Sequence, residues 1–496
     1  SDTVYERVCH HLHLGQYTVR FAGPCTSSSV PGTADRSFLS YPGSCEVIIV
    51  KGIHLNHPLS PVEGPLTPGD ATQQRRHRNR AMAASALSTS IEWYDFLLYG
   101  VAAATVFPRK FFPESDPFIA TLLSFSTFFV GFVGRPIGAA IFGHFGDRVG
   151  RRKLFIVTVM MTGLSTVGIG LVPSYETIGI WGAVLLTVGR ILQGISVGGA
   201  WSGSVLIAGE WSDPKRSGFA TSFAQAGGPF GMVLANGALG FMTLVTSEQQ
   251  FFDWGWRVPF VSTIVLLIIS LYIQLGIAET PVFAHHKATG TIARAPVTAV
   301  VRKNWRQIGL TTLLRTGQQV QFYIFTTYII SYATTRLGFA RGTILNFVMI
   351  EALISAMTVV LFGRLSDTFG RRRLIALGCL LMIGFPFLYF AMLDTKSWIL
   401  VFLAITIALP LQDLQYGPQA AFISETFPGS LRYSGSGLGY QLASITAGGP
   451  APILAAILLR QFGTSTAIAV YMSACSVVSL ISVLMLQDHS GTLDHQ

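Results

Sequence analysis

Seven ionisable side chains lie inside long apolar stretches of this sequence, where a charge is costly. An arginine, lysine or aspartate at the centre of a bilayer costs roughly 2.5–3.5 kcal/mol on insertion scales. Residues of this kind are retained where they bind protons, ions or charged ligands, or where they pair with each other. The seven are Glu92, Asp95, Arg135, Arg190, Arg315, Glu351 and Asp413.

Glu92 and Asp95 have the spacing that proton binding would use. They are three residues apart, so on a helix they share one face. Two carboxylates that close repel each other, which favours the uptake of a proton by one of them. We therefore predict that this pair binds and releases protons. The alternative is that both acids pair permanently with arginines as structural contacts.

Arg135 and Arg315 could hold an anion. A guanidinium inside an apolar segment can grip a carboxylate through two parallel hydrogen bonds. Polar residues follow Arg315 closely, and others cluster near Asp413. We predict that the two arginines bind an anionic group of a ligand, against the alternative of structural pairing with Glu92, Asp95 or Glu351. The remaining residues of the predicted binding site are Gln318, Gln319, Tyr323 and Gln415.

Membrane-spanning helices are the elements that would position these residues. Half of the chain is hydrophobic and 12% is charged, against about 25% charge in soluble domains. Six stretches have no charge over the roughly 20 residues that cross a bilayer, and six more qualify with one or two internal charges. The first six are 154–175, 217–247, 258–278, 374–393, 433–459 and 461–487. The others are 81–107, 117–142, 178–209, 306–335, 342–362 and 397–423.

A basic loop that occurs twice divides these twelve spans into two halves. It begins at Gly143 and again at Gly363, and its aspartates, Asp147 and Asp367, are 220 residues apart. We predict an all-α integral membrane protein of two pseudo-symmetric six-helix bundles. The expected parts are an N-terminal bundle (75–279), a linker (280–305), a C-terminal bundle (306–487) and a C-terminal tail (488–496). Glycine pairs such as Gly134/Gly138 and Gly194/Gly198 predict close helix contacts.

The distribution of basic residues predicts the orientation. With the N-terminus inside, 20 basic residues fall on the cytoplasmic side and 7 on the other. Both termini, both repeated loops and the linker are therefore expected in the cytoplasm. This bias and anionic lipid explain the formal charge of +10, so no nucleic-acid partner is expected.

Residues 1–74 differ from the rest. They contain no span of membrane length and no signal-peptide pattern, and the first methionine of the sequence is Met82. We expect either a disordered or weakly structured extension or an upstream segment that does not belong to the functional protein. Its Cys9, His10, His11 and His13 lack a second spaced set of ligands, so no metal site is expected.

At this point the chain resembles the major facilitator superfamily, and within it the metabolite:proton symporter family, over about residues 76–487. The first loop fits the pattern G-x-x-x-D-[RK]-x-G-R-[RK], and the second departs at Thr368. Further family-like strings run from Glu92 to Phe96, from Arg135 to Gly138 and from Arg190 to Gly194. Another repeated pair runs from Glu210 to Arg216 and from Glu425 to Arg432. One departure is Ala200, where many relatives have glutamate.

The resemblance implies roles for the loops and for Arg190. The loops would form cytoplasmic gates that break and reform during alternating access, in which Asp147 faces arginines and the positive end of a neighbouring helix. The alternative is a basic loop that only fixes orientation. Arg190 would take part in proton coupling. The implied gating residues are Asp147, Arg148, Arg151, Arg152, Asp367, Arg371, Arg372, Glu210, Arg216, Glu425 and Arg432.

The expected function is import of a small organic acid or zwitterionic metabolite by proton symport. Proton-coupled efflux by antiport and solute sensing without transport are the alternatives. An enzyme is not expected, because the sequence has no phosphate loop, spaced metal ligands or nucleophile motif. We expect a monomer in the plasma membrane that interacts with lipid and a small-molecule substrate and needs no cofactor besides the coupling proton.

Overall fold

The computed structural model describes residues 11–14, 17–20, 49–51, 68–289 and 296–488. The chain divides into two units, Ser1–Thr67 and Pro68–Gln496, which are described separately. The first unit contains an antiparallel three-stranded sheet in the order β1 (His11–Leu14), β2 (Tyr17–Arg20) and β3 (Ile49–Lys51). Most of the predicted N-terminal extension, and the tail from residue 489, lie outside the described residues.

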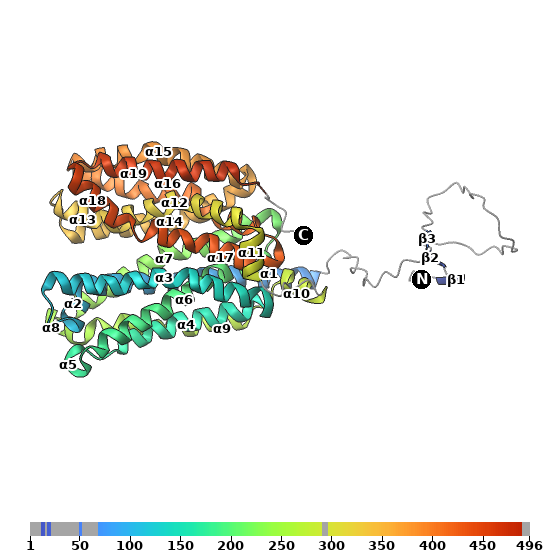
Figure 1. Cartoon of the computed structure of the whole chain (residues 1–496), viewed down its shortest axis with the longest axis horizontal. Helices are drawn as coiled ribbons and strands as arrows, with labels where there is room; N and C mark the ends of the chain where they lie inside the picture. Colours follow the sequence, from blue (N-terminus) through green and yellow to red (C-terminus); the bar gives the residue numbers. More distant parts are fainter. Residues whose placement is uncertain (1–10, 15–16, 21–48, 52–67, 290–295, 489–496) are drawn as a thin grey trace. The chain divides into compact units, whose positions relative to one another are not determined.

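The second unit is helical, and its first half holds six long helices with short ones between them (Figure 1). The long helices are α1 (Pro68–Thr105), α3 (Pro117–Val149), α4 (Arg151–Leu171), α6 (Trp181–Glu210), α7 (Ser217–Val245) and α9 (Arg257–Leu275). The short ones are α2 (Phe107–Phe111), α5 (Tyr175–Ile178), η1 (Pro214–Arg216), α8 (Glu248–Gln250) and η2 (Phe251–Gly255).

The second half repeats this arrangement with two interrupted spans. Its elements are α12 (Trp305–Tyr323), η3 (Ile324–Tyr328), α13 (Ile329–Thr335), α14 (Arg341–Phe369), α15 (Arg371–Asp394), α16 (Trp398–Glu425), η4 (Gly429–Leu431), α17 (Arg432–Ala443), η5 (Ser444–Gly448), α18 (Ala451–Phe462) and α19 (Thr466–Met485). The π-helical turns η3 and η5 join α12 to α13 and α17 to α18. The expected linker contains α10 (Pro281–Ala288) and α11 (Pro296–Lys303).

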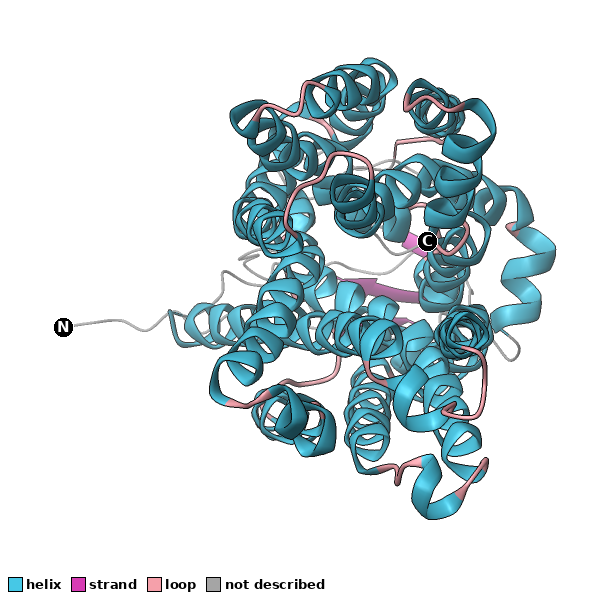
Figure 2. Cartoon of the chain, turned by 90° about the vertical axis from the view of Figure 1, so that its left-hand side faces the viewer, coloured by secondary structure: helices cyan, strands magenta, loops and turns pink. Residues whose placement is uncertain are grey.

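The helices form two groups in the end-on view of Figure 2, and in Figure 1 the two halves of unit 2 lie one above the other. Across the boundary, α3 packs on α17 and α7 packs on α14. We call the end of unit 2 with α10 and α11 the linker end, and the end with α2, α5, α8 and α13 the opposite end (Figure 1).

Ten segments of the described residues are long and apolar enough to cross a membrane. The spans α1 and α12 are not among them, although the packing places each inside its bundle, α1 against α7 and α12 against α19. Both carry the polar residues that the sequence singled out, including Glu92 and Arg315, and these lower the mean hydropathy. Large apolar side chains such as Leu171 and Ile268 are more than 60% exposed, as expected for lipid-facing helices.

The predicted glycine contacts are present where α3 crosses α6. A Cβ added at Gly138 would lie 1.8 Å from the carbonyl oxygen of Ile195, and one at Gly198 would lie 2.0 Å from that of Arg135. Only a residue without a side chain permits this approach. The contact matters for function because Arg135 and Arg190 are carried by these two helices.

Replacing Gly138 by valine should separate α3 from α6. Overpacking of a close interface costs about 1–3 kcal/mol, so we expect a lower melting temperature of the purified protein and weaker transport. Gly237→Ala is the matched control, because a Cβ there has nothing within 4 Å. Equal melting temperatures for the two variants would contradict this account of the contact.

Candidate functional site

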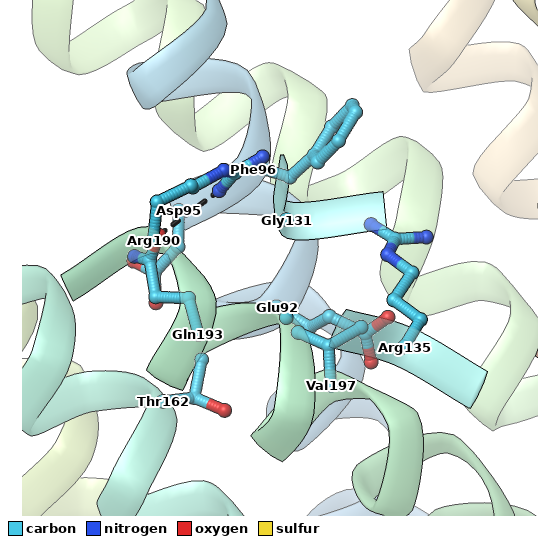
Figure 3. Close-up of a pocket in the computed structure, with 10 residues that line it drawn as sticks. Glu92, Asp95, Phe96, Gly131, Arg135, Thr162, Arg190, Gln193 and Val197 are labelled. Carbon is cyan, nitrogen blue, oxygen red and sulfur yellow. Dashed lines mark hydrogen bonds between the residues drawn. The ribbon is translucent and has the colours of Figure 1, made fainter. Parts of the chain in front are cut away.

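A small cavity lies among α1, α3, α4 and α6 (Figure 3). Its volume is about 10 Å³, which suits about one water molecule. The cavity is therefore too small for a metabolite. Four of the residues that line it are predicted site residues, namely Glu92, Asp95, Arg135 and Arg190. The others are Phe96, Gly131, Thr162, Gln193, Gly194 and Val197.

The two acids of α1 face different arginines. Glu92 lies on the Arg135 side of the cavity and Asp95 on the Arg190 side (Figure 3). Within the described part of the chain, no nitrogen–oxygen contact within 4 Å joins either acid to an arginine. The Thr263 hydroxyl donates to Asp95 Oδ1 at 3.4 Å. Both acids are at most 5% exposed, so neither is hydrated by bulk solvent, and neither has a close ion pair with an arginine of the described residues.

Arg135 is held by aromatic rings rather than by acids. Its guanidinium carbon lies 5.0 Å from the ring centre of Phe96 and 4.9 Å from that of Phe132. The described residues give this guanidinium no hydrogen bond, and it lines the same cavity as Glu92. Cation–π contacts hold the charge in place but leave its N–H donors available. This is the geometry of a buried cation that can accept an anion.

Arg190 is more firmly engaged. Its Nη1 donates to Gln193 Oε1 at 2.9 Å, and Gln193 Nε2 donates to Thr166 Oγ1 at 2.6 Å. The guanidinium also lies over the rings of Tyr99 and Phe128, at 4.4 and 4.8 Å. Asp95 and Arg190 interact electrostatically, so the structure brings together the residues to which the sequence assigned proton coupling.

Arg315 joins the site from the C-terminal half. Its guanidinium carbon lies 2.9 Å from the ring centre of Tyr440, and Trp201 stacks on the same ring with centroids 3.4 Å apart. Because both groups are this close, they must occupy opposite faces of Tyr440. Glu92 interacts electrostatically with both Arg135 and Arg315. Trp201 comes from α6 and Tyr440 from α17, so this stack crosses the boundary between the two halves.

Of the other predicted binding residues, Gln319 and Tyr323 lie near the arginines. Gln319 accepts from Arg315 Nη2 at 2.8 Å when its amide oxygen is turned toward it, and Tyr323 interacts electrostatically with Arg135 and Arg315. Gln318 is buried and its main-chain oxygen accepts from Gln412.

Gln415 is directed elsewhere. It donates to Gln321 at 2.7 Å and accepts from the Cys379 thiol at 3.3 Å. These partners belong to α12 and α15, inside the C-terminal half, so the structure does not bring Gln415 to the central residues. From sequence, Gln415 could not be distinguished from its neighbours, because all sit in one polar run of α16.

Aromatic side chains close the cavity toward the opposite end. Phe96 and Phe132 each make edge contacts with Tyr323, with centroids 6.2 and 6.0 Å apart, and Trp93 contacts Phe322. Along α1, α3 and α12, these rings lie on the opposite-end side of Glu92, Arg135 and Arg315.

Polar contacts close the linker end, and the first set centres on Asp147. Its carboxylate accepts from the backbone nitrogens of Tyr433 and Ser434, at 3.2 and 3.0 Å, and from the Ser434 hydroxyl at 2.9 Å. These donors form the first turn of α17, where a carboxylate is favoured. Arg151 supports the contact, with Nη2 3.9 Å from Asp147 and a hydrogen bond of 2.7 Å to the oxygen of Gly429. Glu210 contacts both Arg151 and Arg432.

The second set repeats the first with the halves exchanged. Asp367 accepts from the backbone nitrogens of Gly218 and Phe219, both at 2.8 Å, at the start of α7. Arg371 lies 3.2 Å from Asp367, contacts Glu425, and donates to the Ser217 hydroxyl at 2.7 Å. Each loop of one half therefore caps a helix of the other half.

Backbone geometry explains the glycine that follows each of these aspartates by three residues. Gly150 and Gly370 have φ values of 126° and 90°, a conformation that favours glycine. They let α4 and α15 begin directly after α3 and α14.

Four predicted gating residues are not part of these clusters in the described structure. Arg148 lies near His144, Arg216 is exposed, and Arg152 and Arg372 contact the backbone oxygens of Leu275 and Leu484. Sequence reasoning missed Ser217, Tyr433 and Ser434, which supply donors across the boundary. It also missed Glu279, which accepts from the backbone nitrogens of Arg151 and Arg152 at 3.1 Å.

A family model of the Major Facilitator Superfamily matches residues 86–452. The chain belongs to this superfamily.

Several related proteins align with most of this chain. It is 38% identical over 416 residues to the "Inner membrane metabolite transport protein YhjE" of Escherichia coli, which covers 83% of this chain and 94% of that protein. It is 37% identical to the Escherichia coli "Shikimate transporter", over 85% of this chain and 97% of that protein. A "Proline/betaine transporter" of Salmonella typhimurium is 30% identical over 86% of each chain.

A solved structure, the proton:xylose symporter XylE bound to 6-bromo-6-deoxy-D-glucose, has the same fold. The TM-score is 0.71 at 19% identity, with 84% of this chain and 98% of that chain covered. The predicted fold class and the predicted membership of a metabolite-transporting family are thus confirmed. This superfamily member is a membrane transporter and not an enzyme.

Proposed function

We propose that the protein imports a small organic acid or zwitterionic metabolite by proton symport, through alternating access between its two bundles. The observation that carries this proposal is the buried Arg135 guanidinium, which has aromatic contacts and shares a cavity with Glu92. Among the described residues, it has no acidic partner within 4 Å. An anionic group of the substrate would supply the missing partner. Arg315, Gln319 and Tyr323 would contact it from the other bundle, while Gln318 stays a predicted second contact.

The names of the relatives agree with an anionic group. Shikimate, proline and betaine each carry a carboxylate, and transporters of these compounds are 30–37% identical to this chain. A carboxylate is the group that a guanidinium binds through two parallel bonds. Efflux by antiport stays the alternative, and no contact in the structure favours it.

In this proposal the linker end faces the cytoplasm and the clusters of Asp147 and Asp367 form its gate. The described state has this gate closed by contacts between the halves and the opposite end closed by aromatic rings. Transport requires one set of contacts to open while the other stays shut. The protein then lies in the plasma membrane with both chain termini on the cytoplasmic side. A single chain provides the complete transport pathway.

The test is uptake by proteoliposomes under an imposed pH gradient. Shikimate, proline, betaine and other small carboxylates are offered with the outside acidic, and we expect at least one to accumulate. Collapse of the gradient with a protonophore should abolish accumulation. Outward movement of substrate against an inward proton flow would instead identify an antiporter, and no movement of any compound would contradict the proposal.

Glu92→Gln should separate substrate movement from proton movement. Glutamine keeps the size of the side chain and one acceptor oxygen, but its amide cannot bind and release a proton at neutral pH. We expect exchange of labelled substrate to persist, while accumulation driven by the pH gradient falls to that of passive equilibration. Fully proton-driven accumulation by this variant would remove Glu92 from the coupling step.

A further inference from the structure

Two acids of the C-terminal bundle, Glu351 and Asp413, are buried without a basic partner among the residues that the structure describes. Glu351 lies on α14 and Asp413 on α16, which pack together, and they are 0% and 1% exposed. The electrostatic neighbour of Glu351 is Asp413. A buried ionised carboxylate without a cation is strongly unfavourable, so two such groups on packed helices favour the binding of at least one proton.

The surrounding helices supply no cation. The helices α7 and α16 contain no lysine or arginine, and Arg341 and Arg364 of α14 are 10 and 13 residues from Glu351, which is about 15 and 20 Å along a helix. The basic residues of α15 lie in its first turn. Arg315 of α12 faces tyrosines and Arg135. From α15, the titratable group that faces Glu351 is Tyr389.

Hydrogen bonds distinguish the two acids. Asp413 Oδ2 accepts from the Thr358 hydroxyl at 2.5 Å, and Ser355 also donates to Asp413. Within the described part of the chain, Glu351 Oε1 accepts only from the backbone nitrogen of Leu409, at 3.0 Å. Its Oε2 is buried without any partner in the described residues. Donors stabilise a negative charge on Asp413, whereas the unpartnered oxygen of Glu351 is the place for a proton.

The two halves differ at this position. Position 351 is equivalent to position 131 through the 220-residue offset of the repeated loop. Position 131 is glycine, and a Cβ there would lie 2.6 Å from Nε of Arg190. The side chain of Arg190 therefore occupies, in the N-terminal bundle, the space that corresponds to the side chain of Glu351 in the C-terminal bundle. This difference argues against a structural role of Glu351 that both bundles share.

We propose that Glu351 and Asp413 form a second proton-binding site, in which Glu351 holds the proton and Asp413 the negative charge. The backbone nitrogen of Leu409 donates a hydrogen bond to Glu351, which connects α16 to α14. The next residue of α16, Pro410, has no backbone N–H donor. Loss of the proton leaves two ionised carboxylates, one on each of the packed helices α14 and α16, and their repulsion loosens α14 from α16. Release of the proton is thereby linked to movement of α16. This role in transport rests on the proposed function, whereas the binding of a proton at Glu351 does not depend on it.

Infrared spectroscopy of the full-length protein in lipid vesicles tests the site without a substrate, because the carbonyl stretch of a protonated carboxyl is separate from that of a carboxylate. At neutral pH, Glu351→Gln should lose one protonated-carboxyl band, and Glu351→Asp should shift that band. Glu248→Gln is the control, because Glu248 is exposed, and it should leave the band unchanged. Should Glu351→Gln fail to fold, the shift in Glu351→Asp decides. Bands identical to those of the unmodified protein in the variant that folds would overturn the proposal.

Transport separates this inference from the proposed function. We expect Glu351→Gln to lower proton-driven accumulation severalfold while labelled substrate still exchanges. An unmodified protein that moves no carboxylate would contradict symport but leave the infrared result standing. Unchanged accumulation together with a lost band would show a proton site that transport does not use, which overturns the proposed link to α16.

Discussion

Replacing Arg135 by alanine is expected to abolish substrate uptake. Arg135 is 5% exposed and lines the cavity of Glu92, and no hydrogen bond from the described residues occupies its N–H donors. Hydrogen bonds to charged groups contribute about 1.5–3 kcal/mol each, so losing two parallel bonds should weaken binding of an anion by at least about 100-fold. Binding of labelled substrate to the purified protein and the KM of uptake both measure this loss.

Two further variants identify the cause. Arg135→Lys keeps the charge but not the paired donors, and we expect an intermediate loss of about tenfold. Arg341→Ala removes an exposed arginine at the opposite end and should change nothing. If Arg135 served only to balance the charge of Glu92, the combined variant Arg135→Ala with Glu92→Gln would regain binding. Substrate recognition by Arg135 predicts that it does not.

The fold could be predicted because membrane helices obey a simple constraint. Apolar segments of sufficient length gave the spans, and the repeated loop gave the division into halves. Hydropathy alone would have missed α1 and α12, because these spans carry Glu92, Asp95 and Arg315. The residues that disturb the membrane signal are the ones that line the candidate site, so the same charges that hide a span also reveal its role.

The site could be predicted only where it is charged. Arg135, Arg190 and Glu92 are conspicuous in apolar sequence, whereas Trp201 and Tyr440 are ordinary residues of membrane helices. Their importance comes from stacking across the two bundles, which depends on tertiary packing between segments more than 200 residues apart. Ser217 and Ser434 were missed for the same reason, because each contacts an acid of the other bundle only in the packed structure. The periodicity of the sequence carries no information about contacts between the two bundles.

The π-helical turns η3 and η5 were also beyond prediction. The turn η5 ends at Gly448, directly before Gly449 and Pro450. A Cβ at Gly448 would lie 2.7 Å from the Tyr323 ring. The glycine therefore lets α12 approach at the aromatic closure, and an irregular turn of this kind is frequent at functional sites.

Replacing Asp147 by asparagine is expected to open the linker end. The carboxylate accepts three hydrogen bonds from the first turn of α17 and is 4% exposed. Asparagine has one acceptor oxygen, and its amide group would face backbone donors. A net loss of about 3 kcal/mol, within the range for bonds to charged groups, changes the ratio of closed to open linker ends by about 100-fold. Transport should fall by more than tenfold, because the gate no longer closes.

Spin labels at Lys153 and Arg373 would report the opening directly, since both are exposed and occupy equivalent positions in the two loops. The distance distribution should move to longer values in Asp147→Asn, and also in Asp367→Asn, whose carboxylate caps α7 in the same way. Asp213→Asn is the matched control, because Asp213 is exposed at the same end and its side chain caps η1 of its own half. If the loops serve only to fix orientation, all three distributions will coincide with that of the unmodified protein. A shift in one aspartate variant alone would show that a single loop gates, and that the repeat is symmetric in structure but not in mechanism.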